Sequence, residues 1–306
     1  MTRQPTLKQV RYLVAVSESG HFGKAAASCH VSQSTLSAGI AELEDVLGVP
    51  LVERNNRAVI LTLLGEEVVR RGRSILLDVE DMRSLCDASA EPFAGKLRLG
   101  VIPTIAPFIL PGLLNRMRSE HPRFKLFIRE DLSGNLVELL HQGELDALLL
   151  ALPFPAERVE TMPLFEDEFM FACHQNHPLA AAQSLNVEQL KGQELLLLED
   201  GHCLREHALD ACSLKEAQVS VPYQATTLNT IVQMVANGIG ITVLPKMAVA
   251  ANVLRGTDVQ IRPFDAQGVS RVVGLMWRKK SPRRNEFQLL GNFIQEASSG
   301  ISIDAK

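Results

Sequence analysis

The stretch FGKAAASCHVSQSTLSAGIAELEDVLGVPLVERNNRAVILT, residues 22–62, has the clearest structural pattern in the chain. Ser32 can cap a helix after the turn at residues 30–31. Four apolar residues then recur at i, i+4, i+7 and i+11 and predict one buried stripe: Leu36, Ile40, Leu43 and Leu47. A short alanine-rich helix over about 23–28 and an amphipathic helix starting near residue 7 precede it. This succession predicts a helix-turn-helix.

The opposite face of the third helix begins with small, hydrogen-bonding and uncharged side chains: Ser32, Gln33, Ser34, Thr35 and Ser37. Such a face suits the major groove of DNA, where base edges offer donors and acceptors. The alternative is an ordinary surface helix with a polar N-terminus. Residues 51–62 predict a hairpin with a polar tip, and a helix-turn-helix followed by such a wing is a winged helix. Arg54 and Arg57 would then contact phosphates or the minor groove.

The charge balance argues against strong DNA binding by a single copy. Residues 1–62 hold six Lys and Arg against five Asp and Glu, a balance of +1, and the whole chain carries −4. Residues 63–90 predict a long helix after Thr62, with apolar residues mostly three or four apart and an interruption at Gly72. The helix could pack on its own domain. We favour dimerisation through it, because a dimer doubles the DNA-binding heads.

The composition is that of a soluble globular protein, with 46% hydrophobic and 22% charged residues. The chain has neither a run of about 18 apolar residues nor a secretory signal, so we expect a cytoplasmic protein whose thiols stay reduced. Phosphate-binding loops of the Walker and GxGxxG types and the GxSxG motif are missing. We therefore expect neither an enzyme nor a cofactor or metal site.

From residue 96 onward, apolar strand segments alternate with helical segments, a pattern typical of a largely parallel α/β fold. Residues 91–95 predict a hinge, and a second change of composition falls near 152–155. We predict two α/β subdomains in residues 96–306, the first formed by about 96–165 and 270–306 and the second by about 166–269. A ligand would bind in the crevice between them.

The segment LEDGHCLREHALDAC, residues 198–212, holds two of the five cysteines. If residues 202–212 form a helix, Cys203 and Cys212 lie on opposite faces and roughly 13–14 Å apart along the axis. A disulfide needs Cα atoms within about 7 Å, so this bond would require the helix to unwind. The helix N-terminus, with His202 and Arg205 near Cys203, would favour the thiolate.

Other interpretations of these thiols remain open. Both cysteines could be inert core residues. Zinc could bind Cys203, His207 and Cys212 with His202 or Asp200 as a fourth ligand, although this also requires unwinding. His207 and Asp210 are expected on a solvated face, and the remaining cysteines are expected to be structural: Cys29, Cys86 and Cys173.

Residues 22–62 resemble the winged helix-turn-helix of LysR-type transcriptional regulators, and the order of linker helix, hinge and α/β domain extends the resemblance over nearly the whole chain. IPT at 102–104, LEDGHCLR at 198–205 and Cys212 resemble the hydrogen-peroxide-sensing members. The resemblance implies a multidomain α+β and α/β protein. Its parts would be a DNA-binding domain (1–62), a linker helix (63–90) and a periplasmic-binding-protein-like effector domain.

The resemblance also implies a mechanism and partners. Hydrogen peroxide would oxidise Cys203 to a sulfenic acid that Cys212 resolves as a disulfide. Four side chains would surround the peroxide: Thr104, Ser133, His202 and Arg271. Position 133 carries Ser where the pattern has Thr, which keeps the hydroxyl but fixes its rotamer less tightly. The expected partners are promoter DNA, a dimer or tetramer of the chain, RNA polymerase and a thiol reductant such as glutaredoxin. A metabolite-responsive regulator and a thiol peroxidase are the alternatives.

Overall fold

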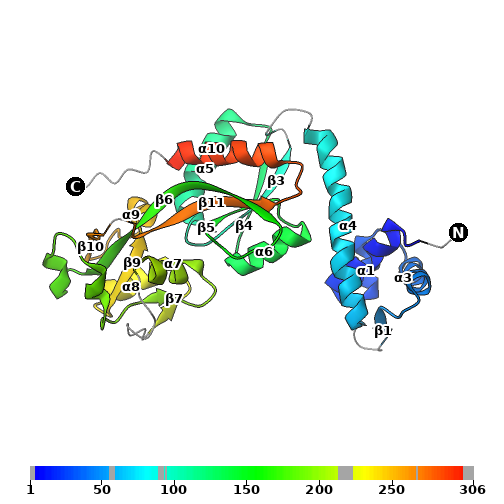
Figure 1. Cartoon of the computed structure of the whole chain (residues 1–306), viewed down its shortest axis with the longest axis horizontal. Helices are drawn as coiled ribbons and strands as arrows, with labels where there is room; N and C mark the ends of the chain where they lie inside the picture. Colours follow the sequence, from blue (N-terminus) through cyan, green and yellow to red (C-terminus); the bar gives the residue numbers. More distant parts are fainter. Residues whose placement is uncertain are drawn as a thin grey trace. The chain divides into compact units, whose positions relative to one another are not determined.

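The computed structural model describes residues 4–54, 59–88, 93, 95–212, 223–266 and 268–298, and side chains throughout these ranges except at 54, 81 and 83–88. The chain divides into two compact units, 1–89 and 90–306, each of which has its own fold. Figure 1 labels their helices and strands.

The N-terminal unit is a winged helix-turn-helix. Its elements are α1 (Leu7–Ser19), α2 (Phe22–Ser28), α3 (Gln33–Leu47), β1 (Val52–Arg54), β2 (Val59–Leu61) and α4 (Leu63–Ala88). The Ser32 hydroxyl caps α3 by accepting from the Thr35 backbone N–H at 3.2 Å. Strands β1 and β2 pair in antiparallel fashion as the wing. The predicted stripe is buried at Leu36, Ile40 and Leu43, but Leu47 is 38% exposed because α3 ends there.

Helix α4 packs on its own domain and also presents an apolar face to solvent. The Thr62 hydroxyl accepts from the Gly65 N–H at 2.9 Å and so starts the helix. A Cβ at Gly72 would lie 2.7 Å from Val10 Cγ1, so the expected interruption is a close approach to α1. The exposed apolar residues of α4 are Leu63, Leu64, Ile75 and Met82. The helix therefore packs on its own domain and still has an exposed apolar face through which a dimer could form.

The C-terminal unit contains a seven-stranded mixed sheet in the order β10-β6-β11-β5-β3-β4, with β9 also paired to β6. The strands are β3 (Lys96–Val101), β4 (Lys125–Glu130), β5 (Ala147–Leu152), β6 (Val159–His174), β9 (Ile241–Pro245), β10 (Val259–Arg262) and β11 (Ser270–Arg278). A short parallel pair, β7 (Leu197–Leu198) and β8 (Gln224–Ala225), lies apart from the sheet.

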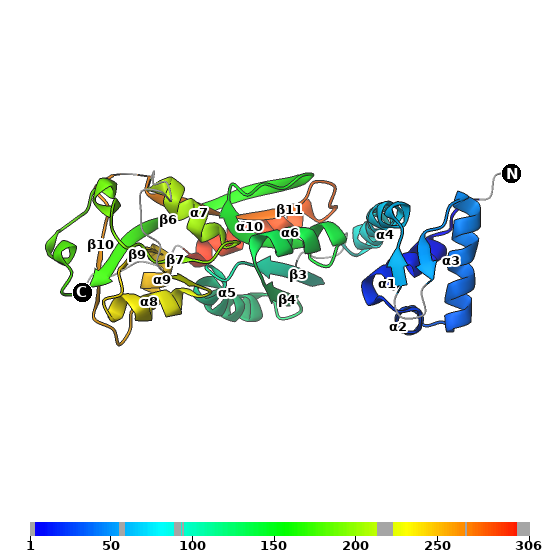
Figure 2. The same ribbon diagram turned by 90° about the horizontal axis from the view of Figure 1, so that it is seen from below.

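The expectation of a largely parallel sheet is wrong. Only β3 with β4 and β3 with β5 are parallel in this sheet, while β11 and β6 run antiparallel to their partners. The reason is the length of β6. It pairs with β11 over residues 159–168 and with β9 and β10 over 169–174, so that one strand serves both halves of the unit (Figure 2).

Helices cover the two halves. They are α5 (Ala106–Glu120), α6 (Ser133–Gln142), α7 (Cys203–Ala211), α8 (Leu228–Ala236), α9 (Lys246–Ala250) and α10 (Arg284–Ser298), with 3-10 turns η1 (Pro178–Ala181) and η2 (Val187–Leu190). Helices α5 and α10 lie on one side of the sheet and α6 on the other (Figure 1).

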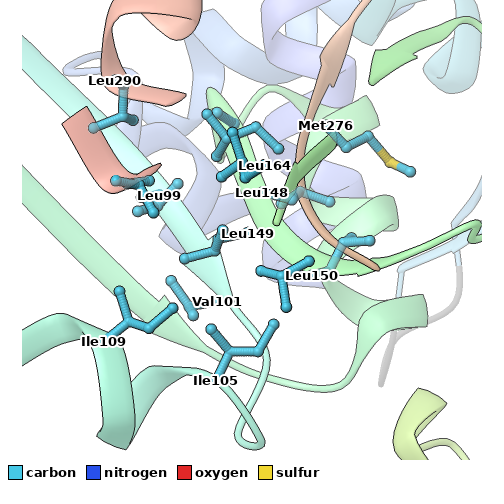
Figure 3. Close-up of a cluster of buried hydrophobic side chains, with 14 of the residues drawn as sticks. Leu99, Val101, Ile105, Ile109, Leu148, Leu149, Leu150, Leu164, Met276 and Leu290 are labelled. Atoms are coloured by element: carbon cyan, nitrogen blue, oxygen red, sulfur yellow. The ribbon is translucent and has the colours of Figure 1, made fainter. Parts of the chain in front are cut away.

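Two hydrophobic cores result. The first surrounds β3 and β5 and includes Val101, Ile105 and Leu149 (Figure 3). The second lies between the far end of β6, β9 and α8, and includes Phe171 and Ile231. Helix α7 joins them, because its first residue belongs to the first core and the residue that caps its C-terminus belongs to the second.

Candidate redox site

Cys203 occupies the first position of α7 and is 4% exposed. The turn before it passes through Gly201, whose φ of +94° is a conformation that favours glycine. A Cβ at Gly201 would also lie 3.2 Å from Leu132 Cδ1, so the turn packs closely on the start of α6. The thiol is thus held at a helix N-terminus, where the helix dipole stabilises negative charge.

Two polar side chains face this thiol. Ser133 is the first residue of α6, and His207 lies one turn along α7 from Cys203. Burial raises the pKa of the Cys203 thiol, but hydrogen bonding from His207 and Ser133 and the positive charge of Arg271 outweigh it, so the pKa is below its ordinary value. Ser133 Oγ and His207 Nδ1 are buried and have no well-formed hydrogen bond to any described atom. Both can therefore bind a thiolate or a small polar molecule.

Arg271 brings the predicted residue Thr104 into the same site. Its side chain is 0% exposed and donates from Nη1 to Thr104 Oγ1 and from Nη2 to the Thr104 carbonyl, both at 2.9 Å. Asp167, from the middle of β6, accepts from Arg271 Nε at 3.0 Å through Oδ2 and from the Met247 N–H at 3.0 Å through Oδ1. Burial raises the pKa of Asp167, and the charge of Arg271 opposes this rise. The sequence reasoning missed Asp167.

His207 is the second residue that the sequence reasoning misjudged. It was expected on a solvated face, but it is half-buried, and its Nε2 lies 3.3 Å from the Pro153 carbonyl oxygen. Residues at i and i+4 share a helix face, so the spacing of Cys203 and His207 was a usable signal.

His202 and Arg205 have surroundings that differ from those expected. Burial lowers the pKa of His202, and the residue is not among the main groups that shift the pKa of Cys203. Arg205 is buried against its own turn, with Nε 3.2 Å from Asp200 Oδ1 and Nη1 donating to the Leu198 carbonyl at 3.3 Å. It borders a pocket of about 520 Å³ beside α7. The main groups that stabilise the thiolate are therefore His207, Ser133 and Arg271.

Cys212 caps the C-terminus of α7, at the opposite end from Cys203. It is 1% exposed, and burial raises the pKa of its thiol to about 12. Both thiols are free, and the intact helix separates them by about 13 Å along its axis. Within the described ranges, no three His, Cys, Asp or Glu side chains are grouped to hold a metal ion. Zinc on both thiols would need α7 to unwind.

Two family models match the chain. The LysR substrate binding domain matches residues 90–299, and the bacterial regulatory helix-turn-helix protein of the lysR family matches residues 7–66. The chain belongs to the LysR family of transcriptional regulators. It is therefore a DNA-binding regulator with an N-terminal helix-turn-helix and a C-terminal α/β effector domain, as predicted.

The chain is similar over nearly its whole length to individual transcriptional regulators and to solved structures. The regulator EstR of Acinetobacter baylyi is 38% identical over 301 residues, 98% of this chain and all of the relative, and OxyR of Escherichia coli K12 is 36% identical over 294 residues, 96% of each. A full-length variant of OxyR from Pseudomonas aeruginosa has a TM-score of 0.79 at 37% identity, covering 96% of this chain and 95% of that chain. A hydrogen-peroxide-bound mutant of Corynebacterium glutamicum OxyR has a TM-score of 0.67 at 33% identity, with coverage of 98% and 95%.

Helix α3 exposes most of the side chains that the sequence predicts to contact DNA. Ser32, Gln33, Ser34 and Thr35 are exposed, and Ser37 is partly exposed. The side chain of Arg54 and the whole of Arg57 lie outside the described residues, as does the side chain of Cys86. Cys29 is partly buried beside the N-terminal core, and Cys173 is fully buried in β6. Among the helices that the structure describes, none is long and apolar enough to cross a membrane.

Proposed function

We propose that this LysR-type regulator responds to hydrogen peroxide through Cys203, which is oxidised and then forms a reversible disulfide with Cys212. The observation that carries the proposal is a buried thiol of lowered pKa at a helix N-terminus, beside polar side chains that lack well-formed hydrogen bonds. The similarity to OxyR proteins, one of them a peroxide-bound structure, supports it.

The first step is attack by the Cys203 thiolate on one peroxide oxygen. An S–O bond forms, the O–O bond breaks, and hydroxide leaves; sulfur is oxidised and peroxide is reduced. Thr104 Oγ1 accepts from Arg271, so its own hydrogen is available to donate to peroxide. Ser133 Oγ can donate or accept in the same space. The charge of Arg271 stabilises the developing negative charge.

In the second step the Cys212 sulfur attacks the Cys203 sulfenic acid: an S–S bond forms, the S–O bond breaks, and the oxygen leaves as hydroxide, which takes up the Cys212 proton to give water. This step needs Cys212 to leave the second core. Its raised pKa keeps it protonated while it is buried, so it becomes a nucleophile only when α7 opens. Opening also exposes Leu204 and Leu209, which are 3% and 9% exposed, at a cost of a few kcal/mol. New burial against another subunit would offset this cost. Oxidation would then change how effector domains pack in a dimer or tetramer, and thereby the spacing of the DNA-binding heads and the contact with RNA polymerase. A thiol reductant such as glutaredoxin would restore the starting state.

The test is whether peroxide alone changes DNA binding. Footprints of the full-length protein on one promoter fragment, before and after peroxide and with no metabolite present, should differ in the spacing of protected half-sites. Cys203→Ser should give one footprint under both conditions, whereas the matched control Cys173→Ser should respond as the native chain does. Identical footprints of the native chain would contradict the proposal and favour a metabolite-responsive regulator. Catalytic turnover of peroxide with a reductant would instead indicate a thiol peroxidase.

A further inference from the structure

His207 reaches back toward Cys203 along α7. The two residues are four apart on one helix, so their side chains share a face, and helical side chains lean toward the N-terminus. His207 Nδ1 is buried without a well-formed hydrogen bond to a described atom. Cys203, on the same face of α7, is a group with which the His207 side chain interacts.

The opposite ring nitrogen is fixed by the backbone. His207 Nε2 lies 3.3 Å from the Pro153 carbonyl oxygen, and a carbonyl can only accept, so Nε2 carries a hydrogen. In a neutral imidazole this leaves Nδ1 unprotonated and able to accept a proton. The same contact holds the orientation of the ring. A nucleophile beside a base that a third group orients is the recurring arrangement of activated thiols.

From these contacts we infer that His207 takes the proton of Cys203 and later returns it to the hydroxide that leaves peroxide, so that Cys203 and His207 act as a nucleophile and its base, with Pro153 orienting the base. Proton transfer from Cys203 to His207 does not require peroxide to be the effector. Return of the proton to hydroxide does, and this part of the inference rests on the proposed function. The balance is complete. Cys203 S–H and His207 become thiolate and imidazolium. The thiolate and peroxide become the sulfenic acid and hydroxide, as the S–O bond forms and the O–O bond breaks. Imidazolium and hydroxide then become neutral His207 and water.

The charged groups around the pair agree with this assignment. Arg271 from β11 favours the thiolate and disfavours a charged His207, but its own charge is paired with Asp167 from β6. Burial lowers the pKa of His207, whereas hydrogen bonding and attraction to Cys203 raise it, and the net change is upward. His202 adjoins Cys203 in the chain, but burial lowers its pKa, which makes it a poor proton acceptor.

The test measures how the rate of Cys203 alkylation by iodoacetamide depends on pH in the reduced full-length protein. Peptide mass spectrometry reports the alkylated fraction of Cys203. His207→Gln, whose amide cannot accept the proton, should move the midpoint for Cys203 upward by one pH unit or more. The rate at neutral pH should then fall about tenfold for each unit. The matched control His141→Gln, an exposed histidine at the end of α6, should keep the native profile. His202→Gln should shift the midpoint less than His207→Gln. An unchanged profile in His207→Gln, or a larger shift in His202→Gln, would overturn the inference.

A second measurement covers the case in which His207→Gln does not fold. NMR titration of labelled histidines in the native protein should give His207 a pKa above the ordinary value, and Cys203→Ser should lower it, because two coupled groups shift each other. A His207 pKa that Cys203→Ser leaves unchanged would overturn the pair. The proposed function fails separately: if peroxide does not oxidise Cys203 while alkylation still depends on His207, the pair stands without the peroxide role. If His207→Gln is oxidised by peroxide at the native rate, the proton return is wrong and peroxide sensing stands.

Discussion

Replacing Asp167 with asparagine should destabilise the C-terminal unit by about 3 kcal/mol. The Asp167 and Arg271 side chains are 2% and 0% exposed, and removing one partner of such a buried pair costs about 3–5 kcal/mol. The lower figure applies because the amide oxygen of asparagine can still accept one of the two hydrogen bonds that Asp167 accepts from Arg271 Nε and the Met247 N–H. The charge of Arg271 would then be buried without a counterion.

The assay is urea unfolding of the reduced full-length protein, followed by tryptophan fluorescence. Trp277 is the only tryptophan of the chain, is 2% exposed and lies on β11 with Arg271, so its signal reports the C-terminal unit. The control Asp265→Asn changes an exposed carboxylate and should alter the free energy of unfolding by less than about 0.5 kcal/mol.

The double variant Asp167→Leu with Arg271→Met separates stability from reactivity. Replacing both partners with apolar side chains should recover most of the lost stability. The same variant should slow Cys203 oxidation, because the charge that stabilises the thiolate is gone. A loss below about 1 kcal/mol in Asp167→Asn would refute the argument that this ion pair holds Arg271 in place.

Four further outcomes are expected. Gly65→Ala should lower the free energy of unfolding of the N-terminal unit by about 1–3 kcal/mol or more in thermal unfolding, because its Cβ would lie 2.1 Å from the Leu51 carbonyl oxygen. Gly112→Ala should raise the free energy of unfolding of the C-terminal unit by about 0.5–1 kcal/mol, because its Cβ would have nothing within 4 Å and alanine favours a helix. Ser37→Leu should abolish footprints at all sites, because a bulky side chain there would block entry of α3 into the groove; unchanged footprints would exclude α3 as the recognition helix. Because the folded-state pKa of Cys212 is raised to about 12, the unfolded chain loses this proton first as pH rises, so the free energy of unfolding should fall above about pH 8.5 by up to 1.4 kcal/mol per unit. Urea unfolding of Cys212→Ser should lack this component of the slope.

Features set by neighbours along the chain could be predicted. The cap at Ser32, the buried stripe of α3 and the start of α4 at Thr62 depend on residues within one or two turns. The structure has the cap, the start of α4 and the stripe as far as Leu43, while Leu47 is exposed. The separation of Cys203 and Cys212 follows from helix geometry alone, and α7 is intact.

Features set by residues distant in sequence could not be predicted. Asp167 and Arg271 are 104 positions apart, and only the antiparallel pairing of β6 with β11 brings them together. The length of β6 likewise depends on having partners in both halves of the sheet. His207 differs, because its spacing from Cys203 was visible, but only the buried start of α7 shows that this face of the helix points inward.

Oxidation of Cys203 by peroxide and its linkage to Cys212 can be followed by mapping the cysteines. Reduced full-length protein is treated with about one equivalent of peroxide, the remaining thiols are alkylated, and peptides are identified by mass spectrometry. We expect one linked peptide pair joining Cys203 and Cys212, with Cys29 and Cys173 alkylated as in the untreated protein. Recovery of Cys203 as the alkylated thiol, with oxidation at Cys173 or at no cysteine, would contradict this expectation.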